Sequence, residues 1–391
     1  MLTDIRGQRD RLGAMDAVLV VGDVGSSGSS DDYEIAAQFL DSVCDSIGCA
    51  PDQVVCVPGN HDIDWKAHTP LHDAVRFQLR HIDLNQLSNG LLRLLQTADG
   101  AEVVFAPLAN YNNFALRYGC AIGASELIWR PKELDLDGFP LFIYGITSPW
   151  ISDAHDWYDD DARRLVAGLF QFLQIGRPER GVHLAMCHHP MRWLRDVEEV
   201  SSWAACAHLY LTGHEHEAGI AISNDGRSVR IASGAVNPDR TETGWIPAYN
   251  VIELDTEDEQ LMVRVHARSW QGRDTKRAEF GPDSVCAVAV FALPLRPADV
   301  RPEIIAPEGA PVEEGVTVPE PEPIKSDTRT MMYRVMRASP DERHAAAREL
   351  GLLVPDEDLG WRDVDVVLLE RAVARGLLPN LDQRLADGGR A

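Results

Sequence analysis

Short apolar runs alternate with segments of helical periodicity up to about residue 295, and this alternation constrains the fold more than any other feature. Runs of four to six residues have the length of a buried strand. The segment between the first two runs has capping residues at its start, apolar residues at Ile35, Phe39 and Val43, and Gly48 at its end, which predicts a helix. A second helix is predicted over 160–175. Such alternation is typical of an α/β sheet covered by helices. The six predicted strands are 17–21, 54–57, 103–106, 141–146, 182–187 and 209–212.

The pattern changes over residues 219–293. Five runs with partial alternation of apolar and polar residues follow one another at short spacing, which predicts antiparallel strands.

Proline divides the chain. Eight prolines lie within residues 294–323, interleaved with glutamates, and proline can sustain neither a helix nor a central strand. We therefore predict a first domain over 1–295, an extended linker over 296–327 and a small all-α domain over 328–391. In the last domain, Ser339, Pro340 and Glu342 predict the start of a helix that ends at Gly351. Two further helices are predicted, over 363–375 and from Pro379.

The charge excludes some functions. There are 61 acidic against 37 basic residues, a net charge of -24, whereas an extended nucleic-acid or anionic membrane surface needs basic side chains. No stretch approaches the ~20 apolar residues of a membrane helix, and residues 1–15 hold no apolar core of a signal peptide. The seven cysteines are an odd number without a Cys-x-x-Cys pair, so we read them as reduced, mostly buried thiols. A cytoplasmic location is the expectation.

Four polar motifs follow predicted strands, where α/β proteins place their sites. They are VVGDV, VPGNHD, AMCHHP and LTGHEH. Aspartate, asparagine and histidine offer oxygen and nitrogen ligands, which suit Mn, Fe or Zn rather than a metal that prefers thiolates. Two such ions could share a carboxylate and clamp a phosphoryl group. The glycines before these residues would let the backbone turn sharply.

The order GD, GNHD, HHP and GHxH resembles the calcineurin-like metallophosphoesterase superfamily, over roughly residues 1–270. The resemblance implies a layered β-sandwich flanked by helices, hence an α/β fold, and a metal-dependent phosphoesterase. It also implies a role for each matching residue. Asp23 would bridge two metals, Asn60, His188 and His214 would complete one metal site, His216 would serve the other, His61 would donate a proton to the leaving group, and Asp62 would orient His61.

Several residues keep a second interpretation. His188 is preferred to His189 because the first histidine of HHP is usually the ligand. His68 and His72 have the spacing of a helical zinc pair, but Pro70 lies between them and we interpret both as surface histidines. The acidic run 159–161 is interpreted as helix capping.

One family motif is missing. The superfamily opens with Asp-x-His on its first strand, whereas here no such motif precedes Asp23. The most similar segment is Asp4-Ile5-Arg6, which has arginine in place of the histidine. In one hypothesis the sequence is a truncated gene model and the full protein has a two-metal site. In the other, one metal site has lost two ligands. We favour the first, because deleting a strand exposes the edge of its neighbour.

The substrate and the last domain are read from weaker resemblances. The insert between GNHD and HHP holds NYNNFALRYG and SPWISDAHDW, whose aromatics could stack on a nucleobase or simply pack a lid. We expect a phosphodiester, from a nucleotide or nucleic-acid end, with a phosphomonoester as the alternative. Residues 328–391 resemble effector-associated domains of bacterial conflict systems, which implies a protein partner, although docking on the chain's own catalytic domain is the alternative. The competing function is a degenerate phosphoesterase fold acting as a sensor or scaffold.

Overall fold

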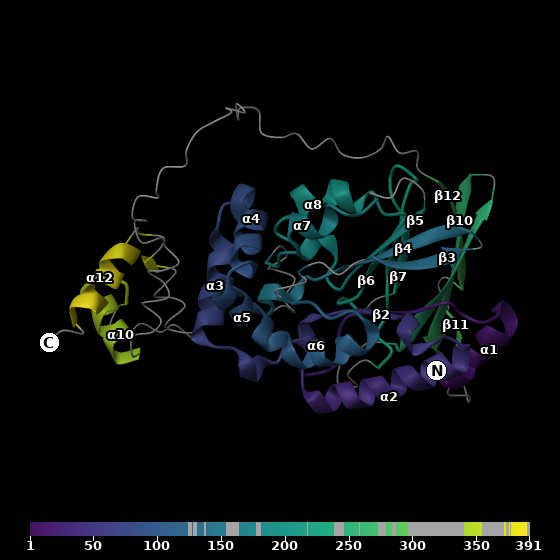
Figure 1. Cartoon of the computed structure of the whole chain (residues 1–391), viewed down its shortest axis with the longest axis horizontal. Coiled ribbons are helices and arrows are strands. Elements are labelled where there is room, and N and C mark those ends of the chain that lie inside the picture. Colours follow the sequence, from purple (N-terminus) through teal and green to yellow (C-terminus); the bar gives the residue numbers. More distant parts are fainter. Residues whose placement is uncertain are drawn as a thin grey trace. The chain divides into compact units, whose positions relative to one another are not determined.

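The computed structural model describes residues 1–123, 127, 131–136, 138–153, 164–176, 181–216, 218–237, 246–257, 259–272, 279–283, 287–295, 340–353, 371–372, 375 and 377–388. The chain divides into two compact units (Figure 1). The first is Met1–Ala67 with Asp83–Pro302, and the second is His68–Ile82 with Glu303–Ala391. No described helix is both long and apolar enough to cross a membrane. The predicted linker 296–327 lies outside the described residues, and the two boundaries between the three predicted segments stay predictions.

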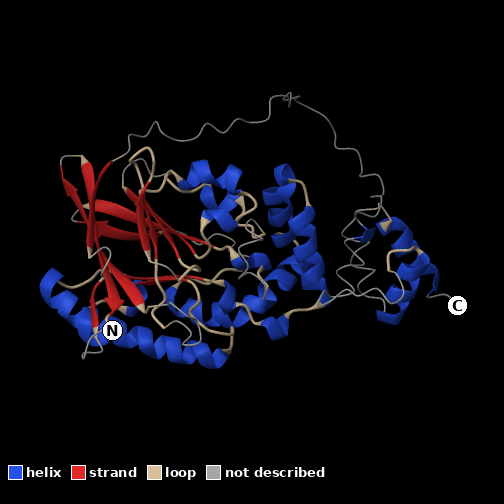
Figure 2. Cartoon of the chain, turned by 180° about the vertical axis from the view of Figure 1, so that it is seen from behind, coloured by secondary structure: helices blue, strands red, loops and turns tan. Residues whose placement is uncertain are grey.

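Three sheets form the strand layers of the first unit (Figure 2). A six-stranded mixed sheet has the order β3-β4-β5-β6-β8-β7, and β4, β5, β6 and β8 run parallel. Its strands are β3 (Lys132–Leu136), β4 (Phe139–Ile146), β5 (Val182–Cys187), β6 (Leu209–Thr212), β7 (Gly219–Ile222) and β8 (Val229–Ala232). A two-stranded parallel sheet joins β1 (Val18–Val21) to β2 (Val54–Val57).

The third sheet is antiparallel and is built around β10 (Gln260–Trp270). Its other strands are β9 (Ala248–Glu257), β11 (Phe280–Pro282) and β12 (Val288–Pro294). The predicted antiparallel strands over 219–293 are confirmed here and in β7 and β8. The mixed sheets and their helices form the α/β, metallophosphoesterase-like layered fold that the resemblance implied.

The helices of the first unit fall into two groups. Helices α1 (Leu2–Leu12) and α2 (Ser30–Ile47) pack on each other, and their buried Ile5, Val43 and Ile47 form an apolar cluster with Val18 of β1. The remaining helices lie in the insert between β2 and β5 and just after β5 (Figure 1). They are α4 (Leu84–Leu95), α5 (Ala98–Phe105), α6 (Ala109–Ala115), α7 (Leu169–Phe172) and α8 (Val197–Ala204). Helix α4 contacts α5 and α7, α7 contacts α8, and α6 contacts α2.

The second unit contains α3 (Pro70–His81), α10 (Pro340–Glu349) and α12 (Leu378–Gly388). Helix α10 begins at Pro340, as its proline predicted, and Gly351 beyond its end has a left-handed φ of +65°. Most of the predicted helix 363–375 lies outside the described residues.

Three predictions were wrong. Residues 103–105 belong to helix α5, not to a strand, because an apolar run of four residues fits either element. Residues 164–168 are not helical, and Leu165 instead bridges Leu194 in parallel, so within the described part of the predicted helix 160–175, which begins at residue 164, Leu169–Phe172 is the α-helical stretch. In α2, Ile35 is 69% and Phe39 37% exposed, so the buried face lies elsewhere, at Tyr33, Leu40, Val43, Cys44 and Ile47.

The cysteines that the structure describes are buried thiols, as predicted. The six described cysteines are all free and buried, and Cys286 lies outside the described residues.

Candidate metal centre

Each of the four motifs follows a parallel strand at its carboxyl end. Asp23 follows β1, Asn60 follows β2, His188 follows β5 and His214 follows β6. Parallel strands present their carboxyl ends at one edge of a sheet, so the pair β1 and β2 and the pair β5 and β6, which belong to two different sheets, each place their polar side chains together.

The side chains of these four residues converge. The Nε2 atom of His188 lies 3.0 Å from Asn60 Oδ1 and 3.3 Å from Asp23 Oδ2, and His214 Nδ1 lies 3.0 Å from the same Asn60 oxygen. Asn60 and His188 are 1% exposed and His214 is 8% exposed. These nitrogen and oxygen atoms have the spacing of atoms that bind one common metal ion.

The backbone at this edge is strained at residues other than glycine. Asp23, His214 and His216 have φ of 51°, 68° and 55°, in the left-handed region that ordinary side chains rarely adopt. Such strain gathers at functional sites, where surrounding structure holds it in place.

Glycines allow the close approach of the motifs. A Cβ on Gly59 would lie 2.2 Å from Asp23 Oδ1, and a Cβ on Gly22 would lie 2.3 Å from His188 Nδ1. Gly22 also has φ of +84°, so the prediction of a sharp turn is confirmed there. At Gly59, whose φ is -110°, the requirement is space alone.

Electrostatics keep the ligating atoms in a binding form. Burial alone would raise the pKa of Asp23, but His188, His216, His61 and the backbone N–H of His61 outweigh burial and hold this pKa well below its usual range. Burial lowers the pKa of His188, which favours the neutral imidazole. His188 Nδ1 also contacts the Val21 carbonyl oxygen at 2.8 Å, so this nitrogen carries the proton and Nε2 stays an acceptor.

Asp62 joins two loops of the site. Its fully buried carboxylate accepts hydrogen bonds from the backbone N–H groups of Val24, Gly25 and Gly59 and from the Tyr33 hydroxyl, at 2.8 to 3.2 Å. Burial and the Asp23 charge raise the pKa of Asp62 to about 7, although the backbone N–H donors act to lower this pKa. Sequence reasoning missed Tyr33, because no local pattern links a helix residue to an aspartate 29 positions later.

His61 lies at the exposed side of the site. Its backbone N–H donates to Asp23 Oδ1 at 2.9 Å, and its ring Nδ1 lies 3.2 Å from the carbonyl oxygen of Ser26. The contacts of the Asp62 carboxylate described above go to the loops, so the expected orientation of His61 by Asp62 stays a prediction.

His189 differs from its neighbour His188. One ligand atom from each of His188, His189 and His214 falls within 4.8 Å of the others, so these three could also hold an ion. However, His189 Nδ1 lies 2.8 Å from the Ser148 hydroxyl, whereas His188 faces both Asp23 and Asn60. The geometry therefore favours His188 as the ligand next to Asp23.

His216 stands apart from the other ligands. Its Nε2 lies 4.0 Å from Asp23 Oδ2, and no group of three ligating side chains in the described part of the chain includes His216. The 4.0 Å distance is longer than the 3.3 Å from His188 Nε2 to the same Asp23 oxygen, so the structure brings His188 closer to Asp23 than His216.

A separate group lies at the start of α3. Thr69 caps this helix and Pro70 is its first residue. One ring nitrogen each of His68 and His72 and one carboxylate oxygen of Asp73 lie within 4.8 Å of one another. His72 is 2% exposed, so its prediction as a surface histidine was wrong. Arg76 already donates to Asp73, and the positive end of a helix dipole disfavours a cation, so we assign no ion to this group.

The described aromatics among those predicted to stack on a nucleobase are part of the core, and Trp157 lies outside the described residues. Tyr111 is 0% and Trp150 1% exposed, and their polar atoms bond to the carbonyl oxygens of Cys56 and Ala167. This burial favours the alternative that the insert aromatics pack the fold. The acidic run 159–161 lies outside the described residues.

The family comparison decides the identity of the fold. The model of the calcineurin-like phosphoesterase family matches residues 2–218, more than half of the chain. This chain belongs to the calcineurin-like phosphoesterase family.

Other comparisons add little to this calcineurin-like assignment. The chain is similar to Vps29 of Chaetomium thermophilum at 8% identity and a TM-score of 0.27, covering 73% of this chain and 85% of that one. It is also similar to zinc-complexed Vps29 of Entamoeba histolytica at 8% identity and a TM-score of 0.19, covering 43% and 61%. A comparison with curated proteins gives no match.

Proposed function

We propose that the chain is a metal-dependent phosphoesterase that holds one divalent ion with Asp23, Asn60, His188 and His214. The observation that carries this proposal is the convergence, from four strand ends, of three buried ligating side chains and the half-buried Asp23. Membership of the calcineurin-like family supports a phosphate ester as the substrate.

The residues fit a metal ion in two respects. Asp23 Oδ2 is buried and has no hydrogen-bond partner, although buried carboxylate oxygens are normally satisfied. Atoms that bind one ion at ~2.1 Å lie ~3.0–3.4 Å apart in octahedral or tetrahedral geometry, and the distances here are 3.0, 3.0 and 3.3 Å. One carboxylate, one amide oxygen and two imidazoles suit Mn, Fe or Zn.

A bound ion would supply Lewis acidity, which polarises a phosphoryl oxygen and makes water a stronger nucleophile. The protein supplies the remaining groups. His61, partly exposed beside Asp23, is proposed to give its proton to the leaving oxygen. Asp62 is proposed to position both loops through the N–H groups of Val24, Gly25 and Gly59.

A phosphodiester is the proposed substrate class, with a nucleotide or nucleic-acid end as its natural form and a phosphomonoester as the alternative. With a net charge of -24, the chain is proposed to attract an anionic substrate through its metal centre rather than through a basic surface.

A second function is favoured by the position of His216, whose Nε2 lies 4.0 Å from Asp23 Oδ2, against 3.3 Å for His188 Nε2 and the same oxygen. The longer distance favours one ion, held by Asp23, Asn60, His188 and His214, over the two ions that the resemblance implied. A fold that binds one ion without turnover would be a sensor or scaffold.

Hydrolysis assays separate the two functions. We expect the Mn- or Zn-loaded protein to hydrolyse bis(p-nitrophenyl) phosphate faster than p-nitrophenyl phosphate, and Asp23→Asn to lower this rate about 100-fold or more. His344→Ala, in α10 and outside the site, is the matched control. A metal-loaded protein that hydrolyses neither ester above the Asp23→Asn rate would be the scaffold.

A further inference from the structure

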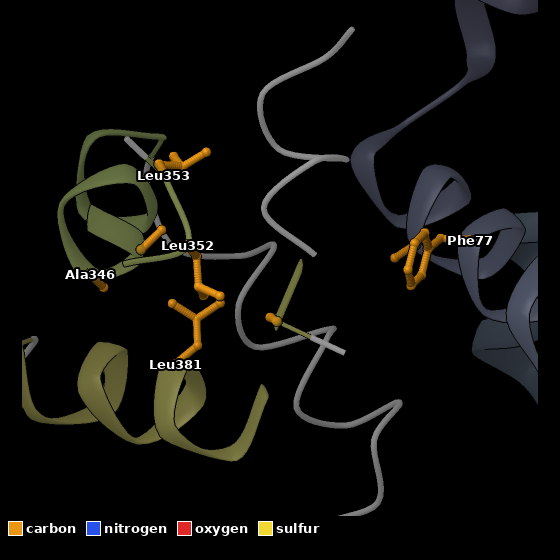
Figure 3. Packing of buried hydrophobic residues seen from close by; sticks show 8 residues of the cluster. Phe77, Ala346, Leu352, Leu353 and Leu381 are labelled. Atoms are coloured by element: carbon orange, nitrogen blue, oxygen red, sulfur yellow. The ribbon is translucent and has the colours of Figure 1, made fainter. Parts of the chain in front are cut away.

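The second unit joins two segments that are far apart in the sequence. Helix α3 follows the GNHD motif by eight residues, and the other helices of this unit lie beyond residue 339. Figure 3 shows eight side chains of their shared cluster, with Phe77 on α3 and Leu352 and Leu381 on the C-terminal helical part.

The buried residues of α3 form two separate stripes. Ala74 and Phe77 are 4% and 7% exposed and belong to the cluster with the C-terminal residues. Val75 and Leu79, 6% and 2% exposed, are not in that cluster, and at 3.6 residues per turn they lie on the other side of the helix. An ordinary surface helix has one apolar stripe, which faces the core of its own domain. A helix with two apolar stripes needs a second packing partner, and the stripe of Ala74 and Phe77 faces the C-terminal residues of the cluster.

The C-terminal side of the cluster is a small core of its own. Ala347, Leu352, Ala372 and Leu381 are each 0% exposed. The end of α10 is closed by Arg371 and Arg375, which donate to the carbonyl oxygens of Leu352 and Gly351 at 3.0 and 2.9 Å. A core this small gains much from one more apolar helix face.

We propose that the Ala74–Phe77 face of α3 is the docking surface for this chain's own C-terminal helices. Docking in cis would make the C-terminal module a partner of its own phosphoesterase insert rather than a free adaptor. The segment between β12 and α10 tethers the module, and tethering gives an effective concentration on the order of 1 mM, far above that of a second copy in solution.

Hydrogen exchange of the full-length chain tests the docking. Leu381→Glu, 300 positions after the end of α3 in the sequence, should accelerate exchange of the amides of residues 70–81 about tenfold. Phe77→Glu should do the same for residues 340–353, whereas Gln78→Glu, a partly exposed neighbour outside the cluster, should change neither segment.

Two outcomes would overturn the proposal. One is unchanged exchange of residues 70–81 in Leu381→Glu, even where the mutation unfolds the module itself. The other is a wild-type dimer in light scattering that Phe77→Glu dissociates, because the module would then dock on a second copy.

Discussion

At the residue scale, a few buried atoms set the geometry of the metal centre. Tyr33 donates from α2 to Asp62 Oδ1 at 3.0 Å and to the Asp62 backbone carbonyl at 3.2 Å. Asp62 in turn holds the loops that carry Asp23 and Asn60. A hydroxyl outside the ligand set therefore acts on the ligands through a buried carboxylate.

We expect Tyr33→Phe to weaken metal binding about threefold to tenfold and to lower the free energy of unfolding by about 1–2 kcal/mol, because the variant leaves a buried carboxylate with one donor fewer. Metal titration and urea unfolding measure the two effects. Unchanged metal affinity in a folded variant would show that Tyr33 only packs.

Close approach at Gly59 gives a second prediction. Gly59→Ala places a Cβ against Asp23 and its backbone, so we expect a loss of about 2 kcal/mol or more in stability and a loss of metal affinity. Gly7→Ala is the control, since Gly7 lies in helix α1 with nothing within 4 Å of the new Cβ, and we expect it to stabilise by about 0.5–1 kcal/mol. Equal effects of the two substitutions in urea unfolding would contradict this account.

At the scale of elements, the start of α2 holds the loop that follows Asp23. The Asp32 carboxylate accepts from the backbone N–H groups of Ser26 and Ser27 at 3.1 and 2.9 Å and from the Ser27 hydroxyl at 2.9 Å. Burial alone would raise the pKa of Asp32, but these donors outweigh burial and lower it. A lowered pKa in the folded state means that the carboxylate stabilises the fold above the unfolded pKa of ~3.9, and that this stabilisation is lost as pH falls.

Asp32→Asn should therefore lower the unfolding free energy by about 1 kcal/mol at pH 6 and by less at pH 3.5. Denaturant unfolding at both pH values measures the difference, with the exposed Asp31→Asn as the control. A deficit in Asp32→Asn that is as large at pH 3.5 as at pH 6 would refute the prediction.

The strands that carry the motifs could be predicted from sequence, whereas several helices could not. The runs 54–57, 182–187 and 209–212 match their strands residue for residue, because each is mostly apolar and ends at a glycine, proline or histidine motif. The run at 103–105 is equally apolar but lies in a helix that Thr97 caps by accepting from the Gly100 N–H. Local composition does not decide between these outcomes, because tertiary packing does.

The candidate site shows the same division. The motif residues could be predicted because each follows its own strand, and parallel strands bring their ends together. The Tyr33–Asp62 bond and the burial of His72 depend on contacts between elements, which no local spacing encodes.

At the scale of the whole molecule, the chain contains a family fold and a helical unit that takes one helix from the phosphoesterase insert. Because the chain has a net charge of -24, we expect a phosphate ester to be attracted by the ion at the proposed metal site and not by the rest of the surface. The proposed phosphoesterase activity therefore depends on metal binding at this site.

Metal content tests this claim most directly. Mass spectrometric metal analysis of the dialysed full-length chain, loaded with Mn or Zn, should give one tightly bound ion per chain, and Asp23→Asn or His188→Ala should lower the affinity about 100-fold or more. His344→Ala should keep the ion. Equal metal content in wild type and Asp23→Asn would contradict the assignment of Asp23, Asn60, His188 and His214 as the metal ligands.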